Sequence, residues 1–311
     1  MDTSVVIETT GVIQTSVSKG TRAIPFALGD RQYDLRDSAL VMGILNRTPD
    51  SFYDKGSTFT LDAFYRRAEQ LIEDGADIVD VGGVKAGPGP EVSESEELDR
   101  VIPVIAELSR RFDIPISVDT WRASVAKQAY ASGAVMGNDI SGFADPDYLK
   151  VAASARASVV ATHIRLAPRV RDPEPQYENV VATVSEFLAQ RANDAMAAGV
   201  DRERIVLDAG LDLGKTPEQS LKLLRASGEL SNLGFPLLLS ASNKTFLGIL
   251  LNLDITERRE ASISAAAIGI CLGCRILRVH DVVGTCRVRN TLAALERTRE
   301  QYQTSSPQQL Q

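Results

Sequence analysis

The sequence predicts a TIM (β/α)8 barrel of the α/β class, with eight parallel strands inside a ring of outer helices. Two observations predict this fold. Eight short apolar runs recur between residues 39 and 280, and segments with helical spacing lie between most of them, which is typical of repeated βα units around a parallel sheet. Polar residues follow the ends of these runs, where the loops of a closed barrel converge on one pocket.

The eight apolar runs are the expected strands, in chain order. They span residues 39–45, 78–81, 116–119, 135–139, 158–163, 205–208, 236–240 and 276–280. An open doubly wound sheet would need a Gly-rich turn after its first strand, and the segment L-N-R-T-P at 45–49 is not such a turn. A barrel of this kind usually takes about 250 residues, so the chain needs no second domain.

We expect three regions along the chain. Residues 1–21 are rich in Ser, Thr and Val without a clean period, and residues 304–311 are polar and interrupted by proline. Both ends are predicted to be flexible tails, so residues 22–303 form the barrel domain.

Composition excludes several classes of function. With 24% charged residues and a net charge of -7, the chain has no basic face that would displace counterions from nucleic acid. No apolar stretch reaches the roughly 20 residues that span a bilayer, so we predict no membrane partner and a cytoplasmic location. The C-x-x-C pair Cys271 and Cys274 is interpreted as small core residues rather than as a redox or metal motif.

The polar residues at the strand ends favour a functional site. A single strand-end Asp can cap the next helix, but here a whole set falls in register at the C-terminal ends of the strands, where barrel loops meet. The set is Asn46, Asp80, Asp119, Asn138, Asp139, His163, Asp208 and His280.

A long motif follows the first strand, and shorter ones follow in a fixed order. Residues 42–52 read M-G-I-L-N-R-T-P-D-S-F, and later segments read D-V-G-G at 80–83, S-V-D-T at 117–120, N-D-I-S-G at 138–142, G-K-T at 214–216, S-N-K at 242–244 and R-V-H-D at 278–281. From about residue 40 to 299 the chain resembles the pterin-binding, dihydropteroate synthase family.

This resemblance implies a reaction and a set of site residues. Family members condense 6-hydroxymethyl-7,8-dihydropterin pyrophosphate with p-aminobenzoate and release pyrophosphate. By similarity, the pterin ring would be bound by Asp119, Asn138, Asp208 and Lys244, whose oxygen acceptors and amine suit a ring with several N–H donors. The pyrophosphate and Mg²⁺ would be bound by Asn46, Arg278 and His280, with Asn46 at the metal. Lys244, Arg278 and His280 would be the catalytic residues, because cations and donors stabilise a departing pyrophosphate.

Some motif residues also have plain structural interpretations. An R-V-H-D segment alone often forms a structural salt bridge rather than a phosphate clamp. The Lys215 motif is not a P-loop, because that loop needs Gly at the position of Ala209. His163 is interpreted as a core residue or as one that supports the site from behind.

The pattern departs from the family around the amine substrate. The family's E-S-T-R-P loop reads V-K-A-G-P at 84–88, its S-R-K has Asn243 at the middle position, and its G-F-G-K aromatic is Leu213, after Asp212. The first loop gains charge at Arg47 and Lys55. The predicted pterin residues are therefore kept, whereas the residues expected around p-aminobenzoate have changed.

We therefore hypothesise a divergent, second-copy type paralogue of dihydropteroate synthase that binds a pterin and has weak or absent conventional activity. One alternative is an active transferase that uses p-aminobenzoate or a different, acidic amine read by Lys85, Arg47 and Lys55. Another is a non-catalytic binding protein built on the barrel. Folate-binding methyltransferases of the same barrel type would not need an Arg–His pyrophosphate clamp. Relatives also imply a homodimer packed through the last helices, here near 257–271.

Overall fold

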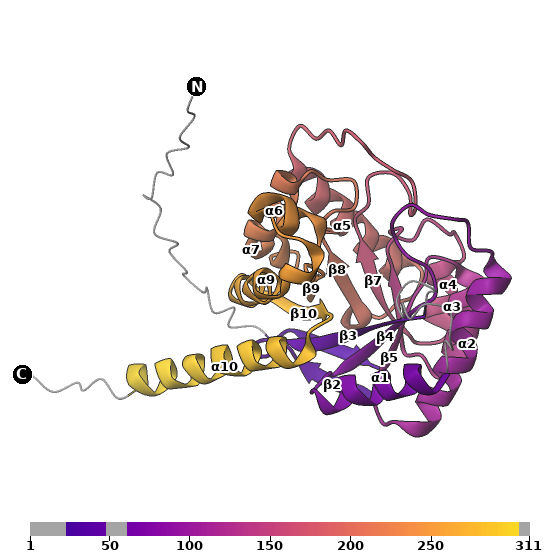
Figure 1. Ribbon diagram of the computed structural model, residues 1–311. Coiled ribbons are helices and arrows are strands. Elements are labelled where there is room, and N and C mark those ends of the chain that lie inside the picture. The colour runs from indigo at the N-terminus through magenta and orange to yellow at the C-terminus, as the bar shows by residue number, and fades with distance from the viewer. Residues whose placement is uncertain (1–22, 48–60, 305–311) are drawn as a thin grey trace, which may run out of the picture.

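The computed structural model describes residues 23–47 and 61–304, and it contains the predicted closed barrel of eight parallel strands. Figure 1 shows the strands at the centre and the helices around them. The barrel order is β10-β3-β4-β5-β6-β7-β8-β9. The strands are β3 Leu40–Asn46, β4 Ile78–Gly82, β5 Ile116–Asp119, β6 Met136–Asp139, β7 Ser158–Thr162, β8 Ile205–Asp208, β9 Leu237–Leu239 and β10 Cys274–Val279.

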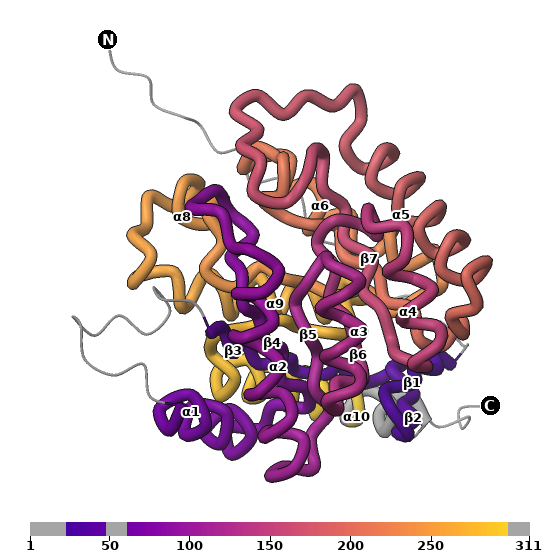
Figure 2. The backbone as a smooth tube through the Cα atoms, turned by 90° about the vertical axis from the view of Figure 1, so that its right-hand side faces the viewer, coloured from indigo at the N-terminus to yellow at the C-terminus, as the bar shows by residue number. Residues whose placement is uncertain are grey.

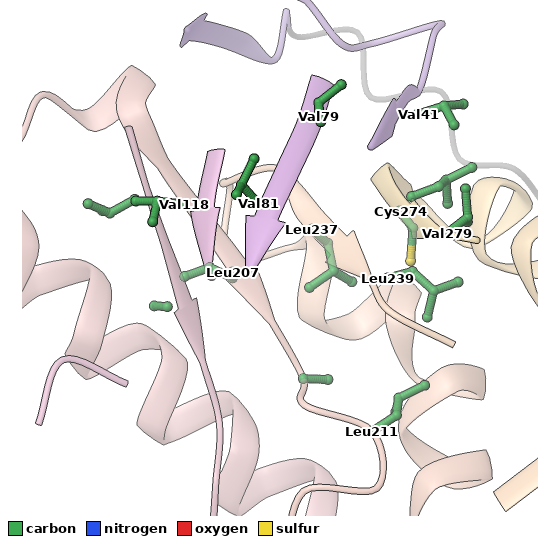
Figure 3. Close-up of a cluster of buried hydrophobic side chains, with 14 of the residues drawn as sticks. Val41, Val79, Val81, Val118, Leu207, Leu211, Leu237, Leu239, Cys274 and Val279 are labelled. Atoms are coloured by element: carbon green, nitrogen blue, oxygen red, sulfur yellow. The ribbon is translucent and has the colours of Figure 1, made fainter. Parts of the chain in front are cut away.

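Outer helices follow the strands as the periodicity predicts. Apolar side chains on the outer face of the strands and the inner face of the helices form one continuous core, part of which is drawn in Figure 3. The helices are α1 Leu61–Glu73, α2 Glu94–Arg111, α3 Ala123–Ala131, α4 Tyr148–Ser154, α5 Val180–Ala197, α6 Pro217–Arg225, α7 Ser227–Ser231, α8 Thr245–Leu251, α9 Arg259–Cys271 and α10 Val282–Thr304, with short 3-10 turns η1 Arg202–Arg204 and η2 Ile255–Glu257.

The register of the strands aligns their polar ends. Asn46 pairs with Gly82, Gly82 with Asp119, and Asp119 with Asn138, so these residues lie side by side across four neighbouring strands. Because all eight strands are parallel, their C-terminal ends open on the same mouth of the barrel. The predicted convergence of the strand-end residues is therefore confirmed at the level of the fold.

A hairpin that the periodicity did not predict precedes the barrel. Strands β1 Pro25–Leu28 and β2 Arg31–Asp34 pair antiparallel, and Figure 2 shows them in indigo at the lower right of the molecule. Phe26 and Leu28 pack into the barrel interior with Met42 and Ile276, and Ser158 Oγ donates to the Ala27 carbonyl at 2.6 Å. The hairpin thus fills the N-terminal end of the barrel, opposite the mouth.

The last helix extends past the barrel. In Figure 1, α10 begins beside β10 and runs outward to the C-terminal end of the described chain. Within residues 23–47 and 61–304, no helix is long and apolar enough to cross a bilayer. The predicted tails, 1–21 and 304–311, lie outside the described part of the chain except for Thr304, which ends α10.

Candidate functional site

The mouth of the barrel has an acidic floor built around one arginine. Arg278 of β10 donates from Nε to Asp80 Oδ2 and from Nη2 to Asp119 Oδ2, each at 2.7 Å. Asn138 Nδ2 donates to the same Asp80 oxygen at 3.2 Å. Four predicted site strands therefore meet in one hydrogen-bonded cluster.

Two carboxylates share the single guanidinium of Arg278. Burial raises the pKa of Asp119 to about 7, the positive charge of Arg278 opposes this shift, and Asp80 adds to it. Asp80 is fully buried, and its Oδ1 has no hydrogen-bond partner among the described residues. A buried acceptor of this kind normally has a partner, so the floor can accept donors from a ligand or from water.

Asp208 and Lys244 form the next part of the floor. Asp208 is buried, its Oδ1 accepts from the Gly210 amide at 2.8 Å, and burial raises its pKa. Lys244 Nζ donates to the Leu211 carbonyl at 3.1 Å. Burial lowers the pKa of Lys244, while the carboxylates of Asp212 and Asp208 oppose this change.

Asn46 lies at the same level as the floor, against a glycine. A Cβ on Gly82 would come within 2.7 Å of Asn46 Oδ1, so the side-chain amide of Asn46 fits only because residue 82 is glycine.

Residues 23–47 and 61–304 hold no cluster of three His, Cys, Asp or Glu side chains that could bind a metal.

His280 lies at the exposed rim, just beyond β10. Its Nδ1 is 3.0 Å from Ser242 Oγ, which also accepts from the His280 amide at 3.2 Å. Partial burial in the mouth lowers the pKa of His280 to about 4, and the positive charges of Arg278, Arg67 and Lys244 lower it further. The imidazole is therefore neutral near pH 7. The structural salt bridge considered for the 278–281 segment also exists, because Arg278 binds Asp80 and Asp119.

Lys215 and His163 form a buried pair behind the floor. Lys215 Nζ lies 2.9 Å from His163 Nδ1 and donates to the carbonyls of Gly210 at 2.8 Å and Leu213 at 3.0 Å. His163 packs edge-on against Phe187, with ring centroids 4.9 Å apart. Every contact of this lysine is internal, which agrees with the rejection of a P-loop and with a supporting position for His163.

Asp212 is a site residue that the sequence did not single out by its chemistry. Its backbone is left-handed, with φ of 67°, and its carboxylate accepts from the amides of Thr245 at 2.5 Å and Phe246 at 3.2 Å. A carboxylate there stabilises the first turn of α8. It also places a negative charge beside Lys244. The family's G-F-G-K segment, with glycine at this position, was the available signal.

The altered loop at 84–88 is held in place rather than left free. Arg169, from the segment after β7, donates from its amide to the Ala86 carbonyl at 3.0 Å and from Nη1 to the Lys85 carbonyl at 3.0 Å. Arg169 Nη2 also donates to the Pro90 carbonyl. Three backbone carbonyls of this segment, those of Lys85, Ala86 and Pro90, therefore bind Arg169.

Arg47 is occupied elsewhere in the structure. Its Nη1 donates to the carbonyls of Asp99 at 3.1 Å and Arg100 at 2.7 Å on α2. Pro103 has no N–H to donate to the Asp99 carbonyl, so Arg47 satisfies an acceptor that the helix leaves unpaired. The expectation that Arg47 reads an acidic amine is not favoured by this geometry. Lys55 and residues 48–52 of the long motif lie outside the described residues.

The fold and site together define a class of pterin-binding barrels. A family model described as "Pterin binding enzyme" matches residues 42–280. The chain is 43% identical over 274 residues to the "Inactive dihydropteroate synthase 2" of Mycobacterium leprae (strain TN), covering 86% of this chain and 94% of that protein. It is 40% identical over 263 residues to the dihydropteroate synthase of Clostridium beijerinckii, covering 84% and 95%.

A solved structure agrees with this class. The dihydropteroate synthase of Xanthomonas albilineans in complex with 7,8-dihydropteroate superimposes with a TM-score of 0.79 at 36% identity, covering 88% of this chain and 98% of that one. The chain therefore belongs to the dihydropteroate synthase family, as its motifs predict. Its similar proteins include synthases and inactive second-copy proteins alike.

Proposed function

We propose that the mouth of the barrel binds 6-hydroxymethyl-7,8-dihydropterin pyrophosphate, with its pterin ring on the acidic floor. Asp119, Asn138, Asp208 and Lys244 would bind the ring. Carboxylates match its N–H donors, and the ammonium of Lys244 matches its carbonyl or a ring nitrogen. The observation that carries this proposal is the cluster of Arg278 with Asp80, Asp119 and Asn138, in which a buried Asp80 oxygen lacks a partner.

The pyrophosphate would lie toward the rim, near Asn46, Arg278 and His280. Mg²⁺ commonly binds through one or two protein oxygens together with substrate phosphates and water, and the amide oxygen of Asn46 fits that role. Bound there, Mg²⁺ would neutralise charge on the departing pyrophosphate. Lys244, Arg278 and the neutral His280 would assist departure by donating hydrogen bonds to the oxygens where charge develops.

The preferred form of the proposal is a pterin-binding paralogue with weak or absent dihydropteroate synthase activity. The loop that replaces E-S-T-R-P offers Lys85, Ala86 and Gly87 where family enzymes have two hydroxyls and a guanidinium. Arg169 donates hydrogen bonds to backbone carbonyls of this loop and so fixes its position. If each lost interaction contributed about 2 to 3 kcal/mol in the transition state, three would lower the rate by about four to six orders of magnitude.

The alternative is an active transferase that joins the pterin to p-aminobenzoate or to a different amine. Lys85 and Lys55 are the remaining cations of the altered loops for an acidic acceptor. We further propose a cytoplasmic homodimer, in which the last helices pack against those of a second copy.

One assay separates these forms of the proposal. Pyrophosphate release from the pterin pyrophosphate would be measured with Mg²⁺, first with p-aminobenzoate and then with a panel of small amines, while product masses are read directly. We expect pterin binding with little release. Rapid release with the mass of dihydropteroate would contradict the preferred form, and a new adduct would establish the altered transferase. Folded protein that does not bind the pterin would overturn the proposal.

A further inference from the structure

We propose that Arg67 of α1 is a phosphate-binding residue of the pyrophosphate subsite. The inference rests on the proposed function, because it assigns a further residue to the same subsite. It concerns a position outside every motif that carries the family resemblance.

Arg67 reaches the rim from outside the barrel. Its Nη2 donates to the backbone carbonyl of His280 at 3.3 Å, which places the guanidinium beside one of the three residues of the proposed pyrophosphate subsite. The side chain is half-buried. Among the described residues, no carboxylate lies within ion-pair distance of Arg67.

Arg67 pairs with no carboxylate among the described residues, whereas Arg278 shares its positive charge between two carboxylates. Arg278 gives its Nε and Nη2 to Asp80 and Asp119. Arg67 makes one hydrogen bond, to a backbone carbonyl, within the part of the chain described. A guanidinium carries five N–H donors and binds phosphate oxygens through a planar fork. Arg67 can therefore bind a phosphate without giving up an ion pair to any residue in 23–47 or 61–304.

The charge pattern of the mouth agrees with this role. The floor is acidic, with Asp80, Asp119 and Asp208, and suits the N–H donors of a pterin ring. The rim is basic by comparison, and the nearby cations Arg278, Arg67 and Lys244 help to keep the His280 imidazole neutral. Since His280 brings hydrogen bonds but no charge, a positive charge at the rim has to come from arginine or lysine.

Arg67 is carried by helix α1 and not by a loop. Its neighbours Phe64 and Ala68 are buried against the barrel, so the packing of α1 fixes the backbone position of Arg67 without any loop closure.

Binding of inorganic pyrophosphate with Mg²⁺ to the full chain, measured by calorimetry, tests the inference. Arg67→Ala should weaken pyrophosphate binding by about tenfold and leave binding of phosphate-free 6-hydroxymethylpterin unchanged. Arg66→Ala is the matched control, because Arg66 is an exposed arginine on the same helix. Arg67→Gln keeps a donor for the His280 carbonyl and removes only the charge, so it should also lose pyrophosphate affinity, and its thermal melting checks the fold.

Each outcome decides the inference. Equal pyrophosphate affinity of the wild type, Arg67→Gln and Arg66→Ala would overturn it. Wild-type protein that binds the pterin but not pyrophosphate would also overturn it, while the pterin part of the proposed function would stand. Loss of both ligands in the wild type would remove the proposed function together with the inference.

Discussion

The contacts of Arg278 explain how one residue can serve both structure and binding. Its guanidinium offsets two buried carboxylates, which would otherwise carry a large desolvation cost. Burial, together with the nearby negative charge of Asp80, keeps the pKa of Asp119 raised although Arg278 opposes this shift. The floor is therefore held together by an interaction that leaves a carboxylate responsive to pH and to a ligand.

Pterin affinity should depend on the ionisation of Asp119. If the carboxylate accepts an N–H of the ring, binding requires the deprotonated form, whose pKa is raised to about 7 by burial. Affinity should therefore rise with pH through about 7 and reach a plateau above it. Below that pH it should fall by up to about tenfold per pH unit. Calorimetric titrations with 6-hydroxymethylpterin over about three pH units, from roughly pH 5.5 to 8.5, would measure this slope.

The control for this prediction is Asp119→Asn, which keeps the shape and removes the titrating group. Its affinity should be lower and nearly independent of pH over the same interval. A wild-type profile as flat as that of the variant would show that Asp119 does not act as the ionised acceptor.

Asp212 should contribute to stability through both its backbone and its carboxylate. Asp212→Ala removes the acceptor of the first α8 amides, which costs about 1 to 2 kcal/mol, and places alanine in a left-handed conformation, which costs about 1 kcal/mol more. Asp212→Asn keeps an acceptor oxygen and tolerates that conformation, so it should cost less than about 1 kcal/mol. Urea unfolding of the two variants would compare them. Equal free energies of unfolding would contradict this account of Asp212.

Residues differ in how well the sequence predicts their position. Asp119, Asn138 and Asp208 follow strand ends, so strand order and register alone bring them to the mouth. Arg67 lies in the middle of a helix, and only the tertiary packing of α1 brings its guanidinium to the His280 carbonyl at the rim. Motif spacing already excludes Lys215 as a P-loop lysine, but only the structure shows the backbone carbonyls that it binds instead.

At the scale of elements, the altered loop and the β7–α5 segment form one docked unit. Arg165 pairs with Asp172 inside that segment, and Arg169 then binds the carbonyls of residues 85, 86 and 90. These contacts use backbone oxygens, so side chains at 85–87 can be replaced without removing them. The loop is thus suited to substitution experiments.

Restoring the family loop should raise turnover with p-aminobenzoate. The quadruple variant carries Val84→Glu, Lys85→Ser, Ala86→Thr and Gly87→Arg. Val84 is buried, so glutamate there would bury a carboxylate. The triple variant therefore keeps Val84 and carries only the other three changes. A Cβ on Gly87 meets no atom within 4 Å, so the first side-chain atom of an arginine there meets no clash. The triple variant should gain at least about tenfold in rate, measured as pyrophosphate release.

The matched control carries Gly87→Ala in place of Gly87→Arg, together with Lys85→Ser and Ala86→Thr. It adds the Cβ and the hydroxyls without the guanidinium, so its gain should be smaller. If folded triple and quadruple variants both stay at the wild-type rate, loss of the loop is not the cause of weak activity.

The hairpin of β1 and β2 shows where sequence patterns fail at this scale. Each strand has only four residues, and β2 reads R-Q-Y-D, without an apolar alternation. The hairpin is stabilised by Phe26 and Leu28, which pack inside the barrel against strands distant in sequence. A local sequence pattern does not predict such long-range contacts, whereas it does predict the buried barrel strands, which are continuous apolar runs.

For the molecule as a whole, the barrel was predictable because each βα unit repeats the same pattern. The eight predicted runs match the eight barrel strands within about two residues at each end. Predicted roles at the mouth followed from motif residues on those strands. The docking of the altered loop could not be predicted from the sequence, because it depends on contacts between loops that are separated by about eighty residues.

The last prediction concerns assembly. Helix α10 extends beyond the barrel in Figure 1, and its Leu295 is 61% exposed, while Ile268 on the adjoining α9 is 46% exposed. Apolar side chains on such a projecting pair of helices favour contact with a second copy. Light scattering after gel filtration should therefore give twice the chain mass of 33.6 kDa.

Leu295→Glu and Ile268→Glu should shift this dimer toward the monomer, because each places a charge in an interface that would otherwise bury an apolar side chain. Leu166→Glu is the matched control, since Leu166 is a similarly exposed leucine on the segment after β7, away from the last helices. A mass of one chain for the wild type across a concentration series would contradict the homodimer. A dimer equally weakened by all three substitutions would place its interface elsewhere on the barrel.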